Sequence, residues 1–98
     1  MEGCFQGCKK LTTAPTIPDS VTNMKDCFLN CTGLTTVPGI SNMVMDMEGC
    51  FRGCTELMIG PDIPSSVKNM KECFLNCTNL KEVKINSPIY KEHNDSYY

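Results

Sequence analysis

Apolar positions recur along this chain with a period of 23 residues and no gap. A methionine opens each unit, a phenylalanine follows four residues later, and a leucine follows six residues after that. Three apolar ladders keep this step: Met1, Met24, Met47 and Met70; Phe5, Phe28, Phe51 and Phe74; Leu11, Leu34, Leu57 and Leu80. A unit of this length cannot close a core alone, so the pattern predicts stacked units that bury a shared core.

Within one unit the pattern predicts a short helix followed by a short strand. Met24, Cys27, Phe28 and Cys31 are spaced as i, i+3, i+4 and i+7, which places them on one face of a helix of about two turns. The segment "LTTVPGI" then combines strand formers with a proline, which predicts short and irregular pairing. Turn residues in "PDS" and "PSS" predict the bend into the next unit.

Length and charge narrow the possible partners. Ninety-eight residues suffice for one domain, and a net charge of −2 with scattered lysines argues against nucleic acid. No apolar stretch approaches the roughly 18 residues of a membrane span. No leader pattern opens the chain, so a removed leader, a longer parent protein and an intracellular protein all stay open.

All eight cysteines lie in four octapeptides such as "MKDCFLNC", a pattern that could serve disulfides, a metal site, a redox centre or the core. The C-x-x-x-C spacing disfavours zinc and thioredoxin-like redox chemistry, which use C-x-x-C. Disulfides between neighbouring units and plain burial in the core both stay open, and the apolar periodicity favours the core. In either case we expect structural cysteines: Cys4, Cys8, Cys27, Cys31, Cys50, Cys54, Cys73 and Cys77.

No constellation for catalysis is present in the sequence. The single histidine, His93, lies outside the repeat body, and no glycine-rich phosphate loop occurs. We therefore expect no enzyme, no cofactor and no metal site.

The unit resembles the BspA-like leucine-rich repeats and related short surface-protein repeats over about residues 1–85. Matching positions are Cys54, Leu57, Ile63, Pro64, Val67, Met70, Phe74 and Cys77. The chain departs from that pattern by one residue added after the leucine, one lost before the aromatic, and cysteine in place of alanine. The resemblance implies a curved solenoid on bacterial or protist surface proteins, which acts in adhesion or partner binding.

Together these observations predict an α/β repeat solenoid. We expect a leucine-rich-repeat-like, right-handed coil of about four units, with short parallel strands and short helical or irregular returns. The units begin near residues 1, 24, 47 and 70 and span 1–85, and 86–98 form a degenerate C-terminal tail or cap.

The residues just after each leucine are the candidates for recognition, because variable positions on a strand face usually carry binding in solenoids. They are Thr12, Thr13, Thr35, Thr36, Met58, Ile59, Lys81 and Glu82. The predicted function is a non-catalytic, extracellular or cell-surface repeat module, part of a longer surface protein, for adhesion or for binding a protein or glycan ligand on a host or neighbouring cell. The alternative is a small subunit that stacks head to tail with copies of itself into an extracellular fibre.

Overall fold

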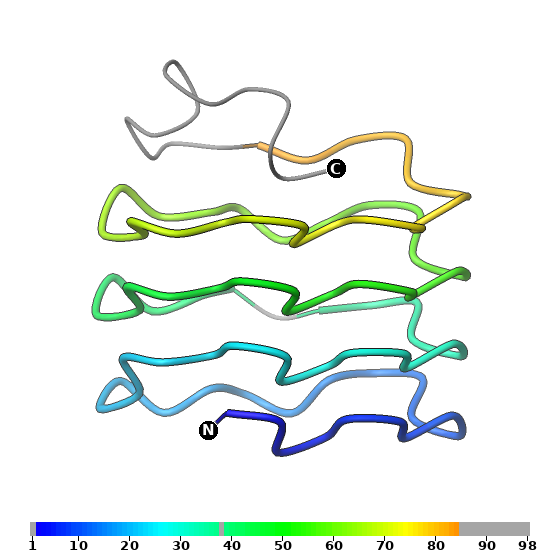
Figure 1. The fold of residues 1–98 in the computed structure, drawn as a ribbon, viewed down its shortest axis with the longest axis horizontal. Helices are drawn as coiled ribbons and strands as arrows, with labels where there is room; N and C mark the ends of the chain where they lie inside the picture. The colour runs from blue at the N-terminus through cyan, green and yellow to red at the C-terminus, as the bar shows by residue number, and fades with distance from the viewer. Residues whose placement is uncertain (1, 38, 85–98) are drawn as a thin grey trace.

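The computed structural model describes residues 2–37 and 39–84. Their backbone runs in layers that stack one above another, from the N-terminal coil at one end to residues 70–84 at the other (Figure 1). We name the layers coil 1 (2–23), coil 2 (24–46), coil 3 (47–69) and coil 4 (70–84). The coils are numbered by the predicted units of 23 residues, whose bounds stay a prediction, and the fold is a solenoid-like repeat. The predicted tail at 86–98 lies outside the described residues.

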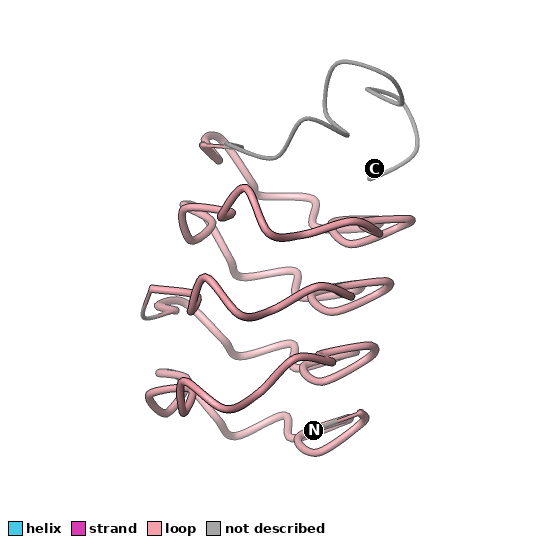
Figure 2. Cartoon of the chain, turned by 90° about the vertical axis from the view of Figure 1, so that its left-hand side faces the viewer, coloured by secondary structure: helices cyan, strands magenta, loops and turns pink. Residues whose placement is uncertain are grey.

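The predicted short helices are wrong, because the described residues contain no helix, and all of them are drawn as loops and turns (Figure 2). The predicted parallel strands are reduced to isolated parallel bridges between residues 23 apart. These bridges join Thr13 to Thr36, Asn23 to Asp46, Asp46 to Asn69, and Ile59 to Glu82. The handedness of the coil stays a prediction. Within the described part of the chain, no helix is long and apolar enough to cross a membrane.

Each octapeptide folds as consecutive tight turns. In coil 2, the amide of Cys27 donates to the Met24 carbonyl and the amide of Cys31 donates to the Phe28 carbonyl, both at 3.1 Å. The third residue of each such turn has a positive φ, 54° at Asp26 and 59° at Asn30. A positive φ at this position is typical of a type II turn, which favours glycine, asparagine and aspartate. The octapeptides therefore form turns where the apolar spacing predicts a helix.

Glycine or a short polar residue stands at nearly every one of these positive-φ positions. Coils 1 and 3 place glycine at both positions, and coil 2 places Asp26 and Asn30 there. Glu72 in coil 4 is the exception, because its φ is 55° although glutamate is not among the residues that favour a positive φ. The positions are Gly3, Gly7, Asp26, Asn30, Gly49, Gly53, Glu72 and Asn76.

Backbone hydrogen bonds join the octapeptides of neighbouring coils along what we call the turn side (residues 2–8, 24–31, 47–54 and 70–77). An amide in one coil donates to a carbonyl 22 residues later in the next coil, as from Phe28 to Cys50 at 2.8 Å and from Phe51 to Cys73 at 2.9 Å. The same step joins coil 1 to coil 2 through Phe5 and Cys27. Every described pair of neighbouring coils is therefore tied on the turn side.

The side chain of the last residue of each unit caps the backbone at the start of the next octapeptide. The side-chain Oδ1 of Asn23 accepts the amide of Lys25 at 2.9 Å. Asp46 and Asn69 accept the amides of Glu48 and Lys71 in the same way, both at 3.0 Å. Asparagine and aspartate form such turns readily, which explains why the unit ends on one of them.

The core is a set of ladders that run through the coils. Stacked phenylalanine rings form its centre, with centroids 5.3 Å apart from Phe5 to Phe28, 5.5 Å from Phe28 to Phe51 and 5.6 Å from Phe51 to Phe74. Met24, Met47, Met70, Leu34 and Leu57 are buried beside them, as are the cysteines of coils 2 to 4, whereas Leu11 and Leu80 in the outer coils are partly buried. Because successive coils place the same residue at the same position, each apolar side chain packs on its own equivalent.

Candidate functional site

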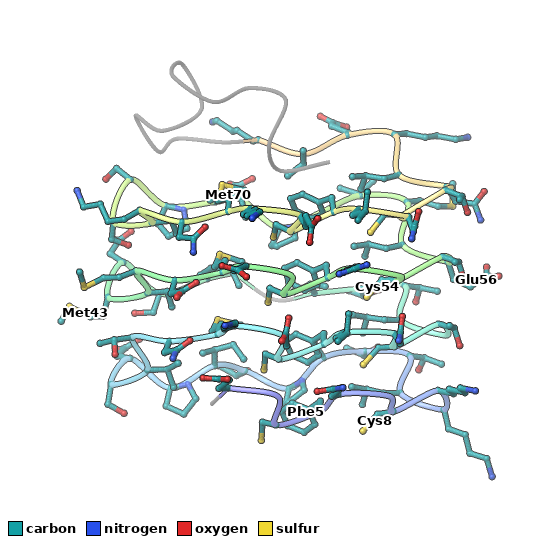
Figure 3. The ribbon with its side chains drawn as sticks, in the orientation of Figure 1. Phe5, Cys8, Met43, Cys54, Glu56 and Met70 are labelled. Atoms are coloured by element: carbon teal, nitrogen blue, oxygen red, sulfur yellow. The ribbon has the colours of Figure 1, made fainter. Side chains whose placement is uncertain are left out.

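The two features that carry chemistry are the cysteine ladders and a hollow on the opposite side of the coils. All eight cysteines are free thiols, and the six in coils 2 to 4 are buried while Cys4 and Cys8 are exposed. The structure therefore favours the core interpretation over disulfides. In Figure 3, Cys54 lies within the stack and Cys8 lies at its N-terminal end.

The second cysteine of each octapeptide in coils 2 to 4 forms a hydrogen bond to the preceding coil. The thiol of Cys31 donates to the Phe5 carbonyl at 3.0 Å, and that of Cys77 donates to the Phe51 carbonyl at 2.9 Å. Cys54 donates to the Phe28 carbonyl at 3.2 Å in the same way. A thiol is a weak donor, yet here it joins neighbouring coils at a backbone carbonyl. These cysteines therefore have a structural role.

Burial makes these thiols poor nucleophiles. Desolvation raises the pKa of Cys27 from an ordinary 9.0 to about 11, with a smaller contribution from the neighbouring Cys4. Desolvation likewise raises the pKa of Cys77 to about 11. The pKa of Cys50 is raised well above its ordinary value by burial and by the thiols around it. Because the thiolate is the reactive form, these residues are less reactive at neutral pH than an exposed thiol.

Metal binding has little support from the side-chain arrangement. Among residues 2–37 and 39–84, no group of three or more His, Cys, Asp or Glu side chains could hold a metal ion. His93 lies outside the described residues.

The predicted recognition residues come together on one side of the coils, which we call the strand face (residues 12–14, 35–37, 58–60 and 81–83). All eight of them are exposed. The amide of Thr35 donates to the Thr12 carbonyl at 2.8 Å, and the amide of Lys81 donates to the Met58 carbonyl at 2.8 Å. The threonine pairs of coils 1 and 2 are therefore adjacent, as are the apolar pair of coil 3 and the charged pair of coil 4. Whether these residues bind a ligand stays a prediction.

A hollow of about 420 Å³ opens between coils 2 and 3 on this face. Its lining has no ionisable side chain and consists of Thr35, Thr36, Val37, Met58, Ile59 and Gly60. Met58 is 49% exposed and Ile59 is 61% exposed, so both present apolar surface to solvent beside the hollow. Its volume lies in the range of about 300–1,000 Å³ that is typical of ligand pockets.

Two lining residues, Val37 and Gly60, were not among the sequence predictions. They occupy the position that Ala14 and Val83 hold in the other coils. A Cβ on Gly60 would lie 3.1 Å from Val83 Cγ2 and 3.3 Å from Phe74 Cε1. Coil 3 therefore packs closely against coil 4 at this point, and a Cβ there would require Val83 or Phe74 to shift. The single glycine at an otherwise Ala/Val position was the signal that sequence reasoning missed.

The comparisons with known proteins give one match. The family model described as "BspA type Leucine rich repeat region" matches residues 1–98 in six copies. No curated protein and no solved structure matches the chain.

Proposed function

Since the chain belongs to the BspA-type leucine-rich repeat family, we propose that it is a non-catalytic surface module that binds a partner protein through its strand face. A surface repeat module is consistent with the family, in which bacterial surface proteins are typical. The observation that carries the binding proposal is the hollow lined by Met58 and Ile59. Exposed apolar side chains beside a concave surface are a common feature of protein interaction sites.

A protein partner is favoured over a glycan by the chemistry of this face. Sugars are commonly held by exposed aromatic rings and by dense hydrogen bonding from charged or amide side chains. The lining of the hollow contains neither, and the aromatic rings of the described residues form the stacked ladder of phenylalanines. An apolar side chain of a protein would bury Met58 and Ile59 without leaving a polar group unpaired.

A non-catalytic role is supported by the state of the thiols. The buried cysteines have raised pKa values, with desolvation as the main cause, so they lack the thiolate that nucleophilic catalysis requires.

The test compares two matched variants on arrays of purified extracellular proteins and of glycans. Met58→Glu places a charge beside the hollow, and Met43→Glu makes the same change at a methionine that is 56% exposed but does not line it. Figure 3 shows Met43, in coil 2, at the left-hand edge of the stack and Glu56, in coil 3 and two residues before Met58, at the right-hand edge. If the partner no longer buries about half of the Met58 side chain, the binding free energy falls by about 1 kcal/mol, and burying the new charge adds a further cost.

We therefore expect Met58→Glu to weaken binding to a protein ligand at least about tenfold and Met43→Glu to leave it unchanged. Binding to glycans alone, or equal binding by the two variants, would contradict the proposal.

A further inference from the structure

The hollow coincides with a break in the backbone hydrogen bonding of the strand face. Coil 1 is bonded to coil 2 there by three backbone hydrogen bonds, and coil 3 is bonded to coil 4 by two. The bonds run from Thr35 N to Thr12 O (2.8 Å), Thr36 N to Thr12 O (3.2 Å), Ala14 N to Thr36 O (3.0 Å), Lys81 N to Met58 O (2.8 Å) and Gly60 N to Glu82 O (2.8 Å). Among the described residues, no backbone hydrogen bond joins 35–37 to 58–60.

The break leaves backbone groups unpaired on both sides of the hollow. By the pattern of coils 1 and 2, Met58 N and Ile59 N would donate to the Thr35 carbonyl, and Val37 N would donate to the Ile59 carbonyl. Coils 3 and 4 make the equivalents of the first and third of these bonds. None of these bonds is made, so three amides and two carbonyls of residues that line the hollow have no protein partner in the described structure. Such groups are strong donors and acceptors that water or a ligand must satisfy.

The break is local, because coils 2 and 3 stay joined elsewhere. On the turn side, Asp26 N donates to the Glu48 carbonyl at 2.9 Å and Asn30 N donates to the Arg52 carbonyl at 2.7 Å. Past the strand face, Lys68 N donates to the Met45 carbonyl at 2.7 Å. The two coils therefore hold the hollow open between fixed points, without any need for the molecule to unfold around it.

We propose that the hollow binds an extended segment of the partner protein, whose backbone pairs with the unpaired amides and carbonyls and whose aliphatic side chain fills the cavity. This inference rests on the proposed function and names its ligand class. An extended peptide offers alternating donors and acceptors along its backbone, which is how strand addition gives affinity. The neutral lining selects against a charged side chain at the centre of the segment, because such a charge would be desolvated without a partner.

A second copy of the chain is a poorer occupant. Its exposed apolar side chains outside the hollow are, among the described residues, Met43 and Met45, at 56% and 51% exposure. The amide of Met45 already donates to the Thr22 carbonyl at 2.8 Å, and its own carbonyl already accepts the amide of Lys68. This segment could place a side chain in the hollow but could not complete the missing backbone bonds.

The experiment titrates the full chain with capped heptapeptides and follows the backbone amides of the protein by NMR. Each peptide alternates threonine and serine around one central residue, which is leucine, valine, aspartate or lysine. A fifth peptide carries the central leucine and N-methyl groups on its backbone amides, which removes the donors and keeps the side chain.

We expect the amides of Val37, Met58 and Ile59 to exchange rapidly with solvent in the free protein, and to slow at least about tenfold with saturating leucine peptide. The leucine peptide should bind at least about tenfold more tightly than the aspartate peptide and than its N-methylated form. Met58→Glu should abolish the shifts, and Met43→Glu should retain them.

Equal binding of the N-methylated peptide would overturn backbone pairing, and so would slow exchange of the three amides in the free protein. Shifts at these amides that grow with protein concentration alone would assign the hollow to a second copy. If an array ligand is lost with Met58→Glu while no peptide binds, partner binding stands and the extended-segment inference fails. If neither the array nor the peptides show binding at this face, both fail.

Discussion

The burial of six thiols predicts a sharp division in cysteine reactivity. Cys4 and Cys8 are exposed, and the other six are buried. At pH 8 the thiolate fraction of a thiol with a pKa of about 11, as at Cys27 and Cys77, is about 100-fold lower than at the ordinary 9.0. Because the reagent must also reach a buried sulfur, we expect the separation in rate to exceed this factor. Native protein should therefore take up two labels quickly and six slowly.

The assay is a pulse of N-ethylmaleimide at pH 8, followed by intact-mass measurement at increasing times. The double variant Cys4→Ser/Cys8→Ser serves as the matched control, because both positions are exposed and the fast phase should vanish without loss of the fold. Urea-unfolded protein should take up eight labels. A third label within about tenfold of the fast rate would refute the burial argument. A gain of about 2 Da on reduction of native material would show a disulfide and refute the free thiols.

Three further predictions concern stability, measured by thermal or urea unfolding. Gly53→Ala should destabilise the protein by about 1–2 kcal/mol, because φ is +78° there and the added Cβ would meet the Asn30 side chain. The control Gly39→Ala, with open space around the added Cβ, should not destabilise the protein, and equal effects of the two variants would argue against the turn. Glu72→Asn should stabilise the protein by a few tenths of a kcal/mol or more, because asparagine tolerates a positive φ better than glutamate and the ion pair to Arg52 that is lost is exposed and weak. A clear loss of stability would contradict this. The folded-state pKa of Cys77 lies above its ordinary value, so its contribution to folding stability should be complete below about pH 9 and lost as the pH rises to about 11. Cys77→Ala should therefore flatten that part of the profile of melting temperature against pH, and an unchanged profile would count against the argument.

The 23-residue period predicted the stacking and the core from sequence alone. Phe28 and Phe51 are buried and stacked as the ladder requires. These features follow from repetition itself, because any residue repeated in register must meet its own copy in the next coil. They do not depend on the local backbone conformation, so an error in secondary structure does not affect them.

The helix prediction failed because two consecutive turns give the same apolar spacing as a short helix. In coil 2, the turn from Met24 to Cys27 and the turn from Phe28 to Cys31 place all four of these residues inside. The distinguishing signal was the polar or glycine residue that precedes each cysteine, Asp26 and Asn30 in this coil. Left-handed backbone at every fourth residue is incompatible with a helix.

The stripe of recognition candidates was placed on one exposed face by the period, but the hollow within it was not. The cavity depends on hydrogen bonds that two coils do not make, and a missing bond leaves no pattern in the sequence. Gly60 was visible at an Ala/Val position, yet its effect depends on how closely Val83 and Phe74 approach it. Distances of this kind are set by packing across coils and follow only from the structure.

The hollow lies at the boundary between two double units. Coils 1 and 3 share one form of the octapeptide, and coils 2 and 4 share another, as in a double unit of 46 residues. The strand-face bridges, Thr13 to Thr36 and Ile59 to Glu82, fall inside the two double units. The junction between them is coil 2 against coil 3, where side chains of coil 2 lie over Gly49 and Gly53 on the turn side and the strand-face bonds are absent.

Inside a double unit the strand-face amides and carbonyls are already bonded to each other, so an extended ligand would have to displace existing bonds to pair with them. At the junction the same groups are unpaired, and pairing with a ligand displaces only water. A ligand that pairs with the backbone should therefore bind once per junction that carries the hollow residues, and not once per coil.

Lengthening the solenoid by one double unit tests this stoichiometry. A variant with one more copy of residues 1–46 placed before the chain would repeat the junction only if the hollow residues were copied as well. We expect it to bind one equivalent of the leucine peptide when coil 3 alone carries Met58, Ile59 and Gly60, and two when the new junction is given the same three residues. One equivalent in both cases would show that the junction is not what the ligand recognises.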